Sequence, residues 1–171
     1  DVNAYLKSLD GGWVDWKETV DSFKSGNPDE TLKAVAVAWM GYTWSIKRAI
    51  EMKCNLLITH EPVFYNHLDR RDGSFAIEST VVKSRLIREN NLAVLRCHDL
   101  WDQMPEMGIP DSWGEFLGLT KRIDGHGFYR VYAIEEKTAG SVAREVAERT
   151  RTLGQEFVQL VGRADTPVRT V

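Results

Sequence analysis

Hydrophobic positions along the chain follow two spacings in alternation, and this alternation predicts a sheet covered by helices. Short, continuously apolar runs at residues 32–39, 56–59 and 92–97 are typical of buried strands. Between them, residues 44–53 and 75–89 carry apolar side chains at the spacing of one helical face. The order strand, helix, strand, helix, strand indicates a parallel unit. We therefore predict the α/β fold class, with a largely parallel sheet flanked by helices.

The remaining segments predict further elements around this unit. Residues 2–9 have the spacing of a helix, and the two glycines at 11 and 12 end it. A polar turn is expected at residues 70–73, and the segment after the third strand predicts a loop leading into a short helix within residues 107–119. Then follow the other expected elements: a strand at 128–134, a helix at 138–153 and a strand at 157–161.

The end of the chain repeats a short pattern found near its beginning. Residues 29–35 and 165–171 both fit D-x-x-[LV]-[KR]-x-V, and the earlier copy leads into the first strand of the predicted α/β unit. The match is either a chance similarity of two turns or a trace of an internal repeat. On the second interpretation, residues 1–163 form an amino-terminal α/β lobe and residues 164–171 begin a second lobe.

Composition narrows the class of protein. The 171 residues are 43% hydrophobic with a net charge of -3, so no strong positive field is available to hold nucleic acid or an anionic membrane. The two cysteines, Cys54 and Cys97, form no CxxC pair, which argues against a thiolate zinc site and for a reducing compartment. No apolar run is long enough to cross a bilayer, and no signal-peptide pattern begins the sequence, so we expect a cytoplasmic protein.

Metal-binding side chains follow two of the predicted strands. His60 and Glu61 come directly after the second strand, and Pro62 prevents the strand from continuing. His98 and Asp102 follow the third strand, four residues apart, so they share a face if the chain turns helically there. Carboxyl ends of parallel strands meet at one edge of a sheet. Imidazoles and carboxylates without thiolates suit zinc, manganese or iron, and a carboxylate can bridge two ions.

Each of these residues also has a simpler interpretation. A histidine after a strand is often a loop or capping residue, and Glu61 could be a solvated charge at the end of a strand. His98 and Asp102 could form a local ion pair. On these interpretations the protein is an α/β interaction domain without a metal.

The motifs taken together resemble a known family. The segments VAVAW, SIKRAIEMKCNLLITHEPVF and NLAVLRCHDLWD are similar to those of the dinuclear-metal-centre hexameric proteins, the family of the NGG-one-interacting factor three, also known as GTP cyclohydrolase I type 2-like proteins. The resemblance implies that His60 is a metal ligand, that Asp102 is the aspartate that bridges the metals, and that His98 lies beside the centre. Glu61 stands where the family has a second histidine, and Met40 where it usually has an aspartate.

The family supplies two further ligands in an H-x-x-x-E motif, and no such motif follows Asp102 here. The resemblance further implies a two-lobed fold, two divalent metal ions and a toroidal homo-hexamer.

Two functional hypotheses follow from the residues and the resemblance together. The first is a dinuclear metal-dependent hydrolase acting on a nucleotide or another phosphate-bearing small molecule, with His60, Glu61 and Asp102 as metal ligands and His98 as the catalytic residue that orients a ligand or carries a proton. The second is a non-enzymatic, metal-binding regulatory or scaffold ring protein. In neither hypothesis do we expect nucleic acid or a membrane as a partner.

Overall fold

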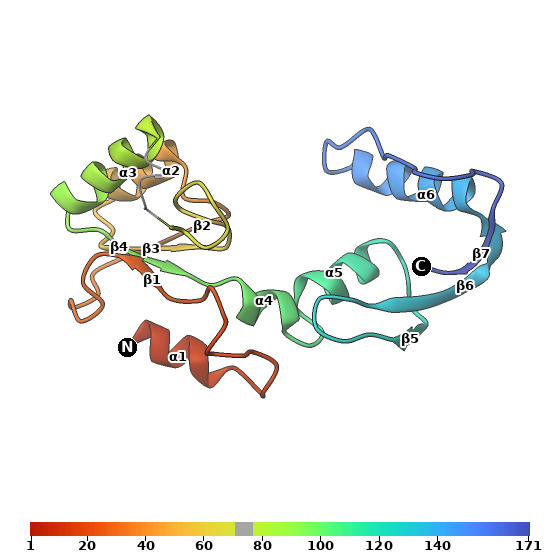
Figure 1. Ribbon diagram of the computed structural model, residues 1–171, viewed down its shortest axis with the longest axis horizontal. Coiled ribbons are helices and arrows are strands. Elements are labelled where there is room, and N and C mark those ends of the chain that lie inside the picture. Colours follow the sequence, from red (N-terminus) through yellow and green to blue (C-terminus); the bar gives the residue numbers. More distant parts are fainter. Residues whose placement is uncertain (71–76) are drawn as a thin grey trace. The chain divides into compact units, whose positions relative to one another are not determined.

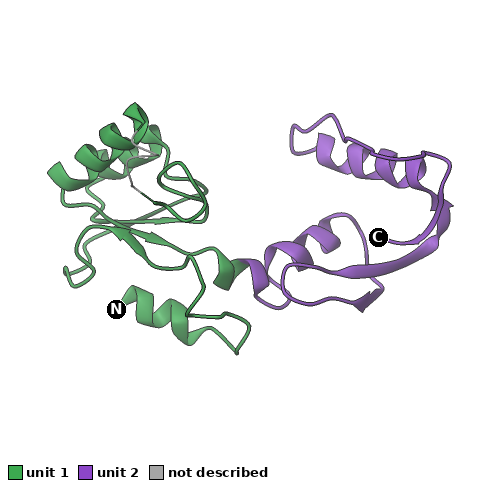
Figure 2. Ribbon diagram, in the orientation of Figure 1, with its two compact units in different colours: residues 1–101 green, residues 102–171 purple. Residues whose placement is uncertain are grey.

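The computed structural model describes residues 1–70 and 77–171 and divides them into two compact units, residues 1–101 and residues 102–171 (Figure 2). Helices and strands alternate through the first unit, and a helix pair with a small sheet forms the second. The helices are α1 (Val2–Ser8), α2 (Thr43–Glu51), α3 (Glu78–Glu89), α4 (Asp99–Gln103), α5 (Ile109–Phe116) and α6 (Ala139–Arg151). The strands are β1 (Phe23–Ser25), β2 (Val35–Ala38), β3 (Leu56–Thr59), β4 (Ala93–Arg96), β5 (Arg122–Asp124), β6 (Val131–Thr138) and β7 (Pro167–Thr170).

A four-stranded sheet of order β1-β4-β3-β2 organises the first unit (Figure 1). β2, β3 and β4 run parallel, and β1 pairs with β4 in the antiparallel direction. The predicted α/β fold class is therefore confirmed, with a sheet that is mixed rather than wholly parallel. β1 has only three residues and no apolar run of its own, so the hydrophobic pattern did not indicate it.

Both faces of the sheet are covered over β3 and β4, which explains why these two strands read as continuously apolar in the sequence. One face packs against α2 and α3, where Ile46 and Ile87 meet Leu57 and Val94. The opposite face packs against α1, whose Leu6 contacts the cluster around Leu56. Figure 1 shows α2 and α3 side by side on one face of the sheet and α1 on the other. Burial of each large side chain stabilises this layered arrangement by about 1.5–3 kcal/mol.

The second unit is a three-stranded antiparallel sheet of order β5-β6-β7 with two helices. α5 lies so close to β6 that a Cβ atom on Gly114 would come within 2.2 Å of the Tyr132 hydroxyl. α6 begins directly after β6, where the Thr138 hydroxyl accepts a hydrogen bond from the backbone N–H of Ser141 at 3.2 Å. This is the usual way in which threonine caps a helix.

The predicted strand at residues 157–161 is wrong. That stretch has no regular structure, and the side chain of Phe157 is 80% exposed. The place beside β6 is taken by β7 instead, which pairs with it in the antiparallel direction, with Ala133 opposite Thr170 and Lys137 opposite Val168. The predicted turn at 70–73 and the first residues of the helix predicted at 75–89 lie at least partly outside the described residues.

The division between the two units falls within α4, and the assignment of residues 1–163 to one amino-terminal lobe stays a prediction. The assignment of residues 164–171 to the beginning of a further lobe stays a prediction. No helix in the described parts of the chain combines the length and the apolar content that a membrane span requires.

Candidate metal centre

Two parallel strands bring the predicted metal-binding residues to one edge of the sheet. Thr59 at the end of β3 lies opposite Arg96 at the end of β4, so both strands stop at the same level. The Cys97 backbone N–H donates to the Thr59 carbonyl at 2.9 Å and continues the ladder by one step. His60 and His98 follow these strand ends, as the sequence predicted.

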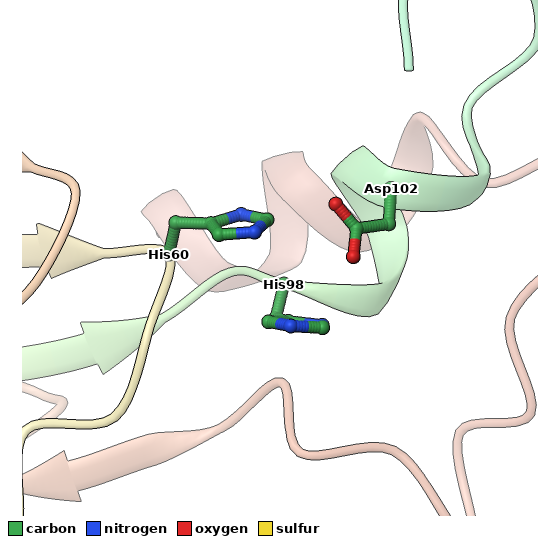
Figure 3. A group of neighbouring side chains, drawn as sticks. All are labelled: His60, His98 and Asp102. Atoms are coloured by element: carbon green, nitrogen blue, oxygen red, sulfur yellow. The ribbon is translucent and has the colours of Figure 1, made fainter. Parts of the chain in front are cut away.

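His60, His98 and Asp102 form the candidate centre, and all three side chains are partly buried. One ligand atom from each residue lies within 4.8 Å of the ligand atoms of the other two. The imidazoles of His60 and His98 are stacked with their ring centroids 4.5 Å apart. Figure 3 shows the carboxylate of Asp102, on α4, turned toward the two imidazoles. Two imidazoles and one carboxylate at this separation are a donor set suited to zinc and related divalent ions.

Asp21 fixes the segment that carries two of these three residues. Its carboxylate accepts hydrogen bonds from the backbone N–H groups of His98 at 2.7 Å, Asp99 at 2.9 Å and Leu100 at 2.8 Å. These donors are the N–H groups of the residue before α4 and of its first two residues, which have no partner within the helix. A buried anion at this position satisfies them and interacts favourably with the helix dipole. Asp21 therefore determines where α4 begins and in which direction its side chains point.

Asp99 orients the imidazole of His98. The two side chains are 3.0 Å apart between Nδ1 and Oδ1, and Asp99 also accepts a hydrogen bond from the Thr19 hydroxyl at 2.7 Å. The hydrogen bond with His98 is the main cause that lowers the pKa of Asp99 to about 2, against the opposing effect of burial. An ionised carboxylate only accepts hydrogen bonds, so the Nδ1 of His98 carries a proton. This arrangement leaves Nε2 of a neutral His98 as the ring nitrogen for a metal or a proton, as in many carboxylate–histidine–metal arrangements.

Glu61, the remaining residue of the predicted set, is directed to a different partner. Its Oε2 lies 3.7 Å from Nη2 of Arg96, and it is not a member of the cluster formed by His60, His98 and Asp102. Arg96 is fully buried, and its Nε donates to the His60 carbonyl at 3.0 Å. Glu61 directly follows His60 in the sequence, but the ion pair with Arg96 directs its side chain to a partner outside the cluster.

His67 and Trp39 also contact the centre, and the sequence pattern did not indicate either of them as part of it. The ring of His67 lies edge-on to that of His98, with centroids 5.4 Å apart. Nδ1 of His67 is 3.4 Å from Nη2 of Arg96, so this ring nitrogen is directed to the guanidinium rather than to the cluster of His60, His98 and Asp102. Trp39 stacks on His60 at 4.3 Å. Only the position of Trp39, directly after β2 at the same sheet edge, could have indicated its role.

A cavity of about 400 Å³ opens beside His60 within the first unit. Its walls are mostly apolar and aromatic, which is typical of a site for a small molecule rather than for solvent. The lining residues are Leu6, Val37, Ala38, Trp39, Ile58, Thr59, His60, Cys97 and Trp101.

Comparison with known proteins identifies the family. A family model described as Duf34/NIF3 (NGG1p interacting factor 3) matches residues 20–171. The chain belongs to the Duf34/NIF3 family. The resemblance that the sequence motifs indicated is thereby confirmed, while no curated protein matches the chain.

Solved structures share the fold of this Duf34/NIF3 chain at low sequence identity. The hypothetical protein SA1388 of Staphylococcus aureus is 16% identical with a TM-score of 0.68, and the match covers 98% of this chain and 69% of that one. A Bacillus cereus protein related to NIF3 is 13% identical with a TM-score of 0.68, over 98% and 74% of the two chains. HcgD of Methanocaldococcus jannaschii is 19% identical with a TM-score of 0.61, over 88% and 56%. The chain therefore spans between about half and three quarters of the length of these proteins.

Proposed function

We propose that the protein binds a divalent metal ion through His60, His98 and Asp102. The observation that carries the proposal is the convergence of these three side chains from two strand ends and one helix to within 4.8 Å. The coordinating nitrogen of His98 is Nε2, because Asp99 holds the proton on Nδ1. The expectation of two ions, and the choice among zinc, manganese and iron, stay predictions.

We further propose that the bound ion serves a hydrolytic reaction on a phosphate-bearing small molecule, with a nucleotide as one expected substrate. A divalent ion in such a centre supplies a Lewis acid for a phosphoryl or carbonyl oxygen and lowers the pKa of bound water. The role predicted for His98 from the sequence, as the group that carries a proton, is the alternative to coordination, because Nε2 cannot bind the ion and carry a proton at once. Asp99 supports that role because an ionised partner stabilises the protonated imidazole.

The cavity beside His60 supports a small-molecule substrate. Trp39 and Trp101 provide flat apolar walls next to the candidate centre. A ring or another apolar part of the substrate would pack against these walls. The reacting group of the substrate would then face the three metal-binding side chains. The closeness of such a cavity to polar groups is a usual feature of binding sites.

Metal content and turnover on matched variants test the proposal. Purified protein is dialysed against zinc, manganese or iron, its metal content is measured by mass spectrometry, and phosphate release is followed on a panel of nucleotides and phosphomonoesters. Asp102→Asn keeps the shape of the side chain and should remove most of the bound metal and the turnover, whereas Asp29→Asn, at an exposed turn, should change neither. Activity that survives in Asp102→Asn would rule out a catalytic ion at this centre.

The alternative of a metal-holding regulatory or scaffold ring predicts a different result. Metal would be retained tightly by the wild-type chain and lost from Asp102→Asn, with no turnover on the whole panel. The expected homo-hexamer belongs to either proposal and is checked by light scattering on the protein in solution.

A further inference from the structure

Arg96 is the largest side chain that the first unit buries completely. It occupies the last position of β4, with a relative exposure of 0%. A guanidinium stays charged at every ordinary pH, so it is stable in such a place only where anionic and carbonyl groups surround it. The groups that surround Arg96 therefore indicate which charges this part of the sheet edge binds.

The donors of Arg96 are distributed over the segment that follows β3. Nε donates to the His60 carbonyl at 3.0 Å, and Nη1 donates to the His67 carbonyl and, at 3.4 Å, to Oδ2 of Asp69. Nη2 lies 3.4 Å from Nδ1 of His67 and 3.7 Å from Oε2 of Glu61. One guanidinium thus interacts with two carboxylates and also binds the backbone of a proposed metal ligand.

Other cations face Asp69, the more deeply buried of these two carboxylates. Lys24 and Lys83 both interact electrostatically with Asp69, and burial lowers the pKa of each ammonium group. Lys83 also donates to the Val63 carbonyl at 2.7 Å. The negative charge of Glu61 and Asp69 is therefore matched by cations that the chain itself provides, and a second divalent ion beside Arg96 would meet repulsion instead of a surplus of negative charge.

We propose that Arg96 takes the place of a second metal ion, holding Glu61 away from the cluster, so that the centre binds one divalent ion through His60, His98 and Asp102. The inference rests on the proposed metal site and specifies its stoichiometry and its ligand set. Glu61 is then a charge partner of Arg96 rather than a ligand. Arg96 is a positioning residue that holds the His60 backbone through the bond from Nε.

Two isosteric variants separate the roles of the two carboxylates. Zinc(II) and manganese(II) are titrated calorimetrically into the full chain, giving the stoichiometry and the Kd. Wild type is expected to take one ion. Glu61→Gln should keep one ion with a Kd within about twofold of wild type, because the amide leaves the cluster intact. Asp102→Asn should raise the Kd by more than about 10-fold, since losing even a supporting partner of a metal ligand typically costs about 10–100-fold.

A third variant tests the role of the guanidinium directly. Arg96→Met has similar length without charge and releases Glu61, so the stoichiometry should rise from one ion to two, while Arg96→Lys should keep one. Circular dichroism checks that the variants fold. If Arg96→Met does not fold, the comparison of Glu61→Gln with Asp102→Asn still decides the question.

The outcomes distinguish this inference from the function on which it rests. Two ions in wild type, or a large loss of affinity in Glu61→Gln, would overturn the single-ion centre and leave the metal-binding proposal standing. Wild type without bound ion, or Asp102→Asn with unchanged affinity, would overturn the proposed metal site and this inference with it.

Discussion

Replacing Asp21 by alanine should destabilise the first unit and weaken metal binding together. Asp21 is 7% exposed, and its carboxylate accepts hydrogen bonds from three backbone N–H groups at 2.7–2.9 Å at the start of α4. Alanine leaves those donors without an acceptor in a largely buried place. Because α4 carries Asp102, and His98 immediately precedes it, the loss reaches two of the proposed ligands through a residue that is not itself in the cluster.

The magnitude follows from the three hydrogen bonds. A hydrogen bond to a charged group contributes about 1.5–3 kcal/mol to stability, and loss of a helix cap costs about 0.5–2 kcal/mol. The three bonds share one carboxylate and are not additive, so we expect Asp21→Ala to lower the free energy of unfolding by about 3–4 kcal/mol. Asp21→Asn keeps one oxygen acceptor and places an amide N–H₂ where the other oxygen was, so about 2 kcal/mol is expected.

Urea unfolding followed by tryptophan fluorescence measures this effect in the relevant unit. Five of the six tryptophans, those at 13, 16, 39, 44 and 101, fall within residues 1–101. Metal affinity measured on the same variants should fall by about 10–100-fold, as for other groups that orient metal ligands. Asp29→Ala is the matched control, because this exposed aspartate should change stability by less than about 0.5 kcal/mol. An Asp21→Ala protein that unfolds at the same urea concentration as wild type would refute the capping role.

Three further predictions concern other parts of the chain. The folded pKa of Asp99 is below its unfolded value, chiefly because of its hydrogen bonds with His98, Thr19 and the Val20 backbone, so a stabilisation of about 2 kcal/mol is present above about pH 4 and is lost as the pH falls toward about 2. Acid unfolding of Asp99→Asn should lack this dependence. Gly114→Ala should cost about 1–3 kcal/mol in thermal or urea unfolding, because the new methyl group meets Tyr132, and an unchanged stability would contradict the close packing of α5 on β6. Trp39→Ala removes one wall of the cavity and should raise the KM of any substrate identified on the panel while circular dichroism stays the same; an unchanged KM would exclude the cavity as the binding site.

Much of the first unit could be predicted because its determinants are local. The apolar run 56–59 and the helical spacing of residues 44–53 correspond closely to β3 and α2. The end of β3 before Pro62 placed His60 at the sheet edge, because proline cannot continue a ladder. Because β3 and β4 are parallel and of equal length, His98 after β4 lies beside His60 after β3. The order of the elements is enough to predict this.

The second unit was less predictable from its pattern. The short apolar segment at 157–161 has the composition of a strand, and β7 at the end of the chain has only four residues. Backbone register and the path of the connecting chain decide which of two short segments pairs with β6. Side-chain periodicity predicts neither of them.

The sequence by itself determined that two imidazoles and a carboxylate meet at one end of a sheet, because strand endings and residue spacing are local properties. Only the tertiary structure decided how Glu61 is directed, since its partner Arg96 lies 35 positions away and is buried by segments distant in sequence. The same holds for Asp21, whose carboxylate caps a helix that begins 78 residues later. Which charged groups pair depends on their distance and burial in the folded chain, and the periodicity of the sequence contains neither quantity.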